Sequence, residues 1–103
     1  MNTFSQGDIV KIEGFKNYFL IVSKNAFIKA TGVFHVCPIL TNTSEGPLHI
    51  MIDGVTEKKS GVVICEQIKF IDPSARGISI ADRISYTQLM NVSDAIQGVF
   101  EYD

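Results

Sequence analysis

The chain has 103 residues, of which 46% are hydrophobic and 19% charged, with a formal net charge of −2 at pH 7. This length fits one domain, residues 1–103, and with neither a run of roughly 20 apolar residues nor a secretory signal we expect a soluble, cytoplasmic protein without a membrane segment. The negative net charge excludes a generally basic surface, so nucleic-acid binding needs a local patch of Lys or Arg.

Short strands are predicted for the first half of the chain. Asp8 to Ile12 predicts a first strand, and after a tight connection the run YFLIVS, Tyr18 to Ser23, predicts its antiparallel neighbour. Residues 25–29 predict a turn or one helical turn, which Thr31-Gly32 ends. The apolar run from Val33 to Leu40 predicts a third strand.

A polar loop separates these strands from two more. Residues 41–47 gather Asn, Thr, Ser, Gly and Pro, which is typical of a loop. Leu48 to Ile52 predicts a fourth strand, and Asp53-Gly54 begins a turn that is too long for a two-residue hairpin. The run GVVICEQIKF, from Gly61 to Phe70, predicts a fifth strand.

The C-terminal residues change from strand to helix periodicity. Leu89, Val92, Ile96 and Val99 recur at three- and four-residue spacing, which places them on one face of a helix. Ser85 and Gln88 have the spacing of a capping box at its start. At least five short strands and one terminal helix predict a mainly β fold, a small SH3-like barrel packed by the helix. The apolar composition of so small a domain also favours a homodimer.

The cysteines and histidines give no sign of a cofactor. Cys37 and Cys65 each lie in an apolar strand-like run, so we expect core packing rather than a disulfide. His35 and His49 are isolated in sequence from other metal ligands. We therefore predict no metal site and no cofactor.

Several short segments keep the order and spacing of one known family. They are Gly7 to Val10, Leu20 to Ser23, Asn25 to Ile39, Gly61 to Asp72, and Ala75 to Gly77. In this arrangement the chain resembles the MazF/PemK toxins of the CcdB/MazF superfamily over nearly its whole length. The resemblance implies an SH3-like barrel, a homodimer, and an mRNA interferase that cuts single-stranded RNA without metal. It also implies inhibition by a cognate antitoxin protein.

Cleavage of RNA without a metal needs a base for the 2′-hydroxyl, a cation or donor for the charged transition state, and an acid for the leaving oxygen. We predict Lys16, Thr41 and Glu66 as the catalytic residues. Lys16 would stabilise the phosphate from beside the position of the family's Arg, and Thr41 would donate to a phosphate oxygen. Glu66 would be base, acid or a brace for a cation. The ordinary alternatives are a solvated turn lysine, local turn bonding, and a surface residue or salt bridge.

Further residues are candidates for RNA contact. Tyr18, like Phe15, lies near the short first loop, where aromatic rings either stack on bases or fill the core, whereas Phe19 is expected in the core. The predicted RNA-binding residues are Asn17, Tyr18, Thr43, Lys69 and Arg76.

Two positions depart from the family pattern. Asn17-Tyr18 stand where members usually carry Arg-Pro, and Leu40 stands where they carry a strand-three Thr, with Thr41 one position later. These departures favour an alternative function, a catalytically degenerate module that binds nucleic acid or protein. A gyrase-directed toxin, an activity found on the same fold, is a third possibility.

Overall fold

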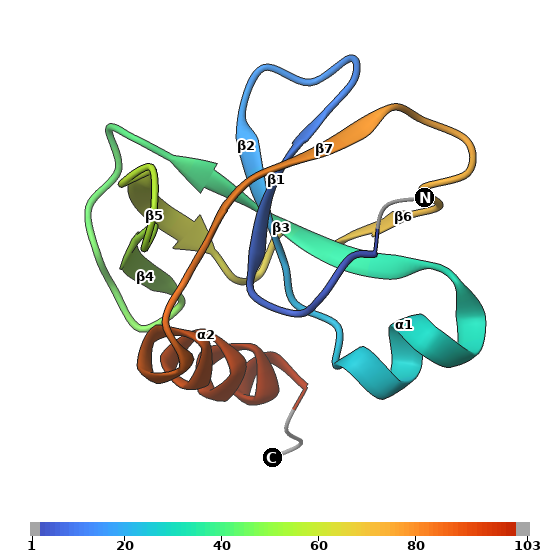
Figure 1. Cartoon of the computed structure of the whole chain (residues 1–103). Coiled ribbons are helices and arrows are strands. Elements are labelled where there is room, and N and C mark those ends of the chain that lie inside the picture. Colours follow the sequence, from blue (N-terminus) through green and yellow to red (C-terminus); the bar gives the residue numbers. More distant parts are fainter. Residues whose placement is uncertain (1–2, 101–103) are drawn as a thin grey trace.

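The computed structural model describes residues 3–100. Their elements are β1 (Asp8–Ile12), β2 (Tyr18–Ile21), α1 (Asn25–Thr31), β3 (Phe34–Leu40), β4 (His49–Asp53), β5 (Ser60–Ile64), β6 (Lys69–Ile71), β7 (Ile78–Arg83) and α2 (Tyr86–Val99). Figure 1 shows α2 beside β4, and α1 leading into β3 at the other side of the molecule. Within residues 3–100, no helix is long and apolar enough to cross a membrane.

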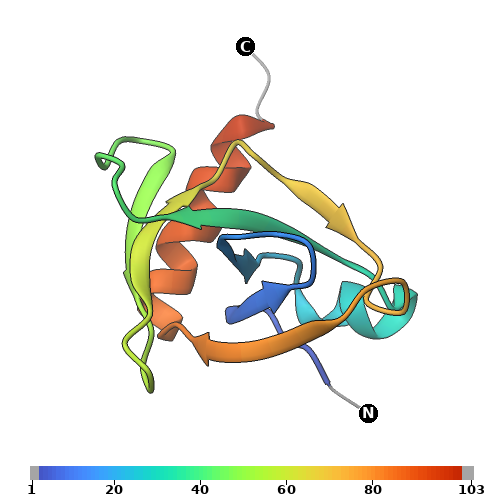
Figure 2. The ribbon, with the colours of Figure 1, turned by 90° about the horizontal axis from the view of Figure 1, so that it is seen from above.

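One strongly curved antiparallel sheet carries all the strands. Its order is β4-β5-β3-β2-β1-β7, and β6 pairs with a second stretch of β3. Val10 lies opposite Phe19 in the β1–β2 hairpin, and Leu20 lies opposite Cys37 in the next ladder. Figure 2 shows this hairpin in the middle of the molecule, with α2 on one side, β6 and α1 on the other, and β7 running past the hairpin to the start of α2.

The central strands are apolar on both faces because each face has its own core. Ile9, Leu20 and Cys37 belong to the core under α2, which also contains Val92. Their neighbours alternate into a second core, which contains Val10, Phe19, Ile21, Phe34, Val36 and Ile71. Strands buried on both faces have continuous apolar sequences, which explains the run YFLI.

The β4–β5 loop joins the two ends of the sheet. β4 and β7 are the terminal strands in the strand order. The backbone N–H of Val55 donates to the carbonyl of Arg83 at 2.8 Å, and backbone groups of the same loop bind the Asp82 carboxylate of β7. These contacts close the curved sheet into a small barrel, so the predicted mainly β fold with a C-terminal helix is confirmed.

Most strand positions agree with the sequence predictions, with three differences. The predicted fifth strand is two strands, β5 and β6, separated by a turn in which the N–H of Gln67 donates to the carbonyl of Ile64. The strand β7 was not predicted. The segment predicted as a turn or single helical turn is the seven-residue helix α1, which Gly32 ends in the left-handed conformation.

The start of α2 matches the predicted helix, but the capping box is only half present. The Ser85 hydroxyl accepts a hydrogen bond from the Gln88 N–H at 3.3 Å. The Gln88 side chain does not bind Ser85 in return; its Oε1 accepts from the Asp53 N–H at 3.1 Å. The second half of the predicted box therefore ties the helix to β4 instead.

Candidate functional site

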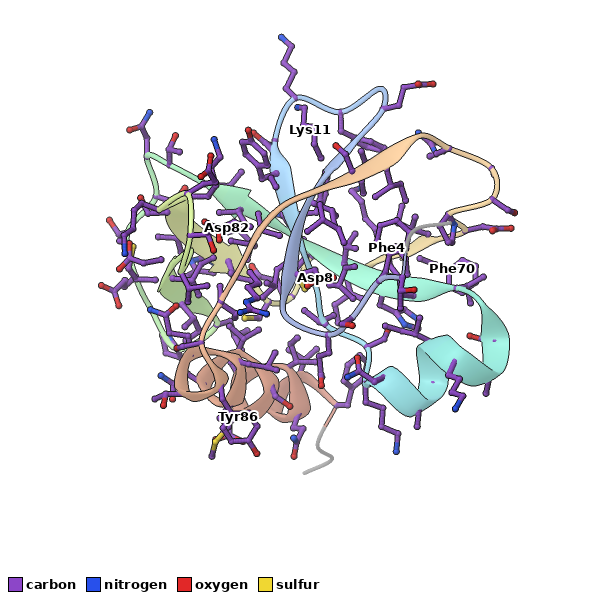
Figure 3. All side chains as sticks on the ribbon, in the orientation of Figure 1. Phe4, Asp8, Lys11, Phe70, Asp82 and Tyr86 are labelled. Atoms are coloured by element: carbon purple, nitrogen blue, oxygen red, sulfur yellow. The ribbon has the colours of Figure 1, made fainter. Side chains whose placement is uncertain are left out.

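The β1–β2 loop, residues 13–17, is short and held by its own strand. The ammonium of Lys11 donates to the carbonyls of Phe15 and Lys16, each at 2.6 Å. Gly14 takes a φ of 91°, which allows the tight reversal before the Phe15 N–H donates to the Ile12 carbonyl at 3.1 Å. Figure 3 shows Lys11 on β1 below this loop. The loop is thus a fixed platform for the side chains it carries.

One side of the loop carries an aromatic ring between two cations. The Lys69 ammonium lies 5.9 Å from the centre of the Phe15 ring, and the Arg76 guanidinium lies 5.1 Å from it. An Arg76 Nη1 also donates to the carbonyl of Glu13 at 3.4 Å. Beside the ring is a hollow of about 480 Å³ whose lining includes Phe70. Lys69 and Arg76, predicted from the sequence as RNA contacts, therefore meet at Phe15.

The other side of the loop repeats the arrangement around Tyr18. The Lys11 ammonium lies 5.6 Å from the centre of the Tyr18 ring, and the Lys59 ammonium lies 5.2 Å from it. Lys59 comes from the β4–β5 loop and is half-buried. Such contacts stabilise a cation next to a ring while leaving its charge available to an anion.

We term these two clusters, one on each side of the β1–β2 loop, the basic aromatic surface, and together they hold much of the chain's positive charge. The residues are Lys11, Phe15, Lys16, Tyr18, Lys59, Lys69 and Arg76. Its five cations are more than half of the nine Lys and Arg residues in the chain. Positive charge is thus concentrated around this loop, which is the kind of local charge that a protein of net charge −2 needs to bind a polyanion.

Glu66 lies in the turn between β5 and β6. Its Oε2 lies 3.1 Å from Nε2 of His49 on β4, and the two side chains are 39% and 34% exposed. The hydrogen bond from His49 lowers the pKa of Glu66 below its ordinary value. A carboxylate next to an imidazole at a solvent-exposed position can take up or deliver a proton.

The three predicted catalytic residues do not all lie together. Tyr18 pairs with Ile39, so Lys16 before it and Thr41 after β3 leave the sheet at the same end. Glu66 lies on the other side of β3, beside its middle, because β5 and β6 pair with successive parts of that strand. Among residues 3–100, no side-chain hydrogen bond or ion pair joins any two of them.

The remaining predicted RNA contacts are exposed or half-exposed in loops. Asn17 is exposed in the β1–β2 loop, directly before Tyr18. Thr43 is half-buried in the β3–β4 loop, which begins at Thr41. Both therefore stand at the end of the sheet where Lys16 lies.

Two cations of the surface were missed by sequence reasoning. Lys11 is a charged residue between apolar residues of a strand, and this position could have indicated that its ammonium reaches the strand's end. Lys59 stands beside Lys58 in a polar stretch, and no local pattern places it over Tyr18. Among residues 3–100, no three His, Cys, Asp or Glu side chains gather in a way that could hold a metal ion.

Comparisons with known proteins agree on one fold. Residues 5–100 match the family described as PemK-like, MazF-like toxin of type II toxin-antitoxin system. A MazE–MazF crystal structure from Deinococcus radiodurans (Form-II) superposes with a TM-score of 0.83 at 18% identity, covering 100% of both chains. No curated protein matches the sequence.

Two structures from a mycobacterial species are also similar. One is an endoribonuclease, with a TM-score of 0.79 at 18% identity over 95% of this chain and 91% of that chain. The other is an endoribonuclease in complex with its cognate antitoxin, with a TM-score of 0.79 at 16% identity over 98% of this chain and 100% of that chain. At these identities the superpositions establish the fold.

Proposed function

The chain belongs to the PemK-like, MazF-like toxin family of type II toxin-antitoxin systems, and from that premise we propose that it is an endoribonuclease that cuts single-stranded RNA without a metal ion. The observation that carries the proposal is the basic aromatic surface. Single-strand binders combine cations that follow the phosphates with rings on which bases stack. Phe15 and Tyr18, each flanked by two cations, supply both features at a loop that is already fixed.

The proposed reaction is an internal transfer of the phosphodiester. The 2′-oxygen bonds to phosphorus as its proton is removed, and the 5′-oxygen leaves as it gains a proton, so the product ends in a 2′,3′-cyclic phosphate. Lys16 stabilises the charge on the phosphate, and Thr41 donates to one of its oxygens from the same end of the sheet. We assign the proton exchange to Glu66, which is hydrogen-bonded to His49 but separated from Lys16 and Thr41 across β3.

The purified protein incubated with a long mixed RNA in EDTA tests the proposal. Discrete fragments with cyclic phosphate ends are expected, and intact RNA at high protein concentration contradicts the enzyme. Glu66→Gln is expected to lower kcat by about a hundredfold, the usual cost of losing a general acid or base. Lys24→Ala is the matched control, because Lys24 stands before α1 and makes no side-chain cap there.

We propose the same surface as the antitoxin-binding site and a homodimer as the active form. An acidic, partly disordered antitoxin segment would neutralise the cations and cover the rings. Exposed apolar side chains on β4 and α2, namely Met51, Tyr86 and Met90, are available for a second copy. Light scattering gives the oligomeric state, and a monomer at micromolar concentration contradicts the dimer.

A binding module without nuclease activity is the second candidate. The observation that favours it is the separation of Glu66 from Lys16 and Thr41 across β3. For a binding module we expect RNA to bind with an affinity that falls as the salt concentration rises, and to remain uncut. Growth arrest with loss of mRNA on overexpression would contradict this function.

A further inference from the structure

Asp82 is the one buried charged side chain among the residues that the structure describes, with 5% of its surface exposed. Its carboxylate accepts backbone hydrogen bonds from Thr56 at 2.9 Å, Glu57 at 2.9 Å and Lys59 at 3.3 Å. A fourth comes from the N–H of Arg83 at 2.8 Å. Three of the four donors belong to the β4–β5 loop, so the loop is wrapped around this carboxylate.

The loop sequence fits tightly around that contact. A Cβ added to Gly54 would collide with the Asp82 carboxylate and lie 3.0 Å from the Lys59 nitrogen. Lys58 takes a left-handed φ of 57°, which turns the chain so that the neighbouring N–H groups point inward. The Val55 N–H is bonded to the Arg83 carbonyl at 2.8 Å. Figure 3 shows Asp82 on β7 close to the β4–β5 hairpin.

Lys59 connects this loop to the basic aromatic surface. Its backbone N–H is held by Asp82 at 3.3 Å, and its ammonium lies 5.2 Å from the centre of the Tyr18 ring. The buried carboxylate of β7 and the ring at the start of β2 are thus linked through one residue. A loop of this length without such an anchor would leave Lys59 free to sample many orientations.

We propose that Asp82 is a positioning residue of the RNA-binding site, which fixes the β4–β5 loop so that Lys59 presents its ammonium over Tyr18 to an RNA phosphate. The inference rests on the proposed RNA binding and adds a determinant on β7 that touches no RNA itself. Asp82 acts only through Lys59.

The sign of the effect separates this role from simple electrostatics. Removing a negative charge near a polyanion site strengthens binding when the charge acts only at a distance. If Asp82 positions Lys59, Asp82→Asn weakens binding instead, because the amide cannot accept the same set of N–H groups. Asp53→Asn is the matched control, since Asp53 is an exposed carboxylate at the end of β4.

The experiment measures binding of a short 2′-O-methyl RNA, which cannot be cleaved, to the wild type, Asp82→Asn, Lys59→Ala and the double variant. Each single variant is expected to weaken binding by about fivefold and to reduce the salt slope by about 0.7, as for one lost phosphate contact. The double variant should be no weaker than Lys59→Ala, because both substitutions remove the same contact.

Three results of the binding experiment overturn the proposal: Lys59→Ala binding like the wild type, folded Asp82→Asn binding as tightly as Asp53→Asn, or additive losses in the double variant. The result for Lys59→Ala stands even if Asp82→Asn does not fold. The ring-current shift of the Lys59 side-chain protons over Tyr18, measured by NMR without RNA, is expected to vanish in Asp82→Asn. Failure of the wild type to bind RNA would contradict the proposed function, whereas retention of the NMR shift in Asp82→Asn contradicts the positioning.

Discussion

Cys37 and Cys65 carry free thiols inside the core. Burial raises the pKa of Cys37 to about 12, helped by the nearby Cys65 and Glu66, and burial with Glu66 raises the pKa of Cys65 to about 11. Because the thiolate is the reactive form, we expect neither thiol to react with Ellman's reagent in the native protein near pH 8. Both should react in denaturant. Rapid labelling of either thiol without denaturant would contradict the buried positions.

Gly54 is the glycine with least room for a side chain, since a Cβ there would meet the Asp82 carboxylate. Gly54→Ala is expected to lower the free energy of unfolding by about 2 kcal/mol or more, because the loop must move away from its anchor. Gly46→Ala is the control, because nothing lies within 4 Å of a Cβ at that position. Urea denaturation of both variants checks the difference, and equal stabilities would contradict the close packing at Gly54.

Single residues also show how far sequence reasoning reaches at the site. Lys69 and Arg76 were predicted as RNA contacts, and both lie beside Phe15, although they are far from it in the sequence and no local pattern predicts that meeting. Lys59 reaches Tyr18 only through a loop anchored on β7, a contact between residues far apart in the sequence. The catalytic roles of Lys16, Thr41 and Glu66 remain predictions.

At the scale of elements, the N-terminus of α2 depends on one side chain. The Ser85 hydroxyl accepts from the Gln88 N–H, one of the free donors of the first turn. Ser85→Ala is expected to cost about 1 kcal/mol of stability, the usual value for a lost N-cap. The helix packs on the core through Val92, so thermal unfolding of the whole chain should report the loss.

Gly98→Ala near the other end of α2 is the companion variant, with open space around the added Cβ. It is expected to stabilise the protein by about 0.5–1 kcal/mol through helix propensity. Ser85→Ala and Gly98→Ala should shift the melting temperature in opposite directions. A shift in the same direction would contradict the expected effects on the stability of α2.

Two features of the sheet could not be predicted from the sequence, each for its own reason. The run from Gly61 to Phe70 contains no breaker, yet β5 and β6 pair with different parts of β3 and the chain turns between them at Glu66. The single fully buried residue of β7 is Asp82, so this strand lacks the apolar alternation by which strands are recognised. By contrast, β1 and α2 carry regular apolar patterns and were predicted closely.

At the scale of the whole molecule, the Asp82 carboxylate joins the two ends of the sheet, and its pKa is shifted in the direction opposite to that of the nearby Asp8. Burial acts to raise the pKa of Asp82, but four backbone N–H groups outweigh it, and the pKa lies below its ordinary value. Asp8, on the strand beside β7, has the opposite balance: burial raises its pKa, against lowering effects from the Ser5 N–H and Arg83. As the pH falls, protonation of Asp82 therefore lowers the free energy of unfolding, whereas protonation of Asp8 raises it.

The sign for Asp82 follows from linkage. A carboxyl whose pKa is lower in the folded state contributes stability that is complete above its unfolded pKa, about 4, and is lost as pH falls through the folded value. Asp8 has a raised pKa, so its protonation as the pH falls offsets part of this loss. We therefore expect the stability difference between the wild type and Asp82→Asn to be constant from about pH 7 to pH 5 and to shrink below about pH 4.

Urea unfolding of both proteins across this range measures the difference directly, and the subtraction removes the contribution of Asp8. Protonation of Asp82 should release the β4–β5 loop from β7, and with it the closure between the two terminal strands. The acid-treated wild type should then unfold like Asp82→Asn. A difference that stays constant down to about pH 3 would mean that the carboxylate's charge does not hold the barrel closed.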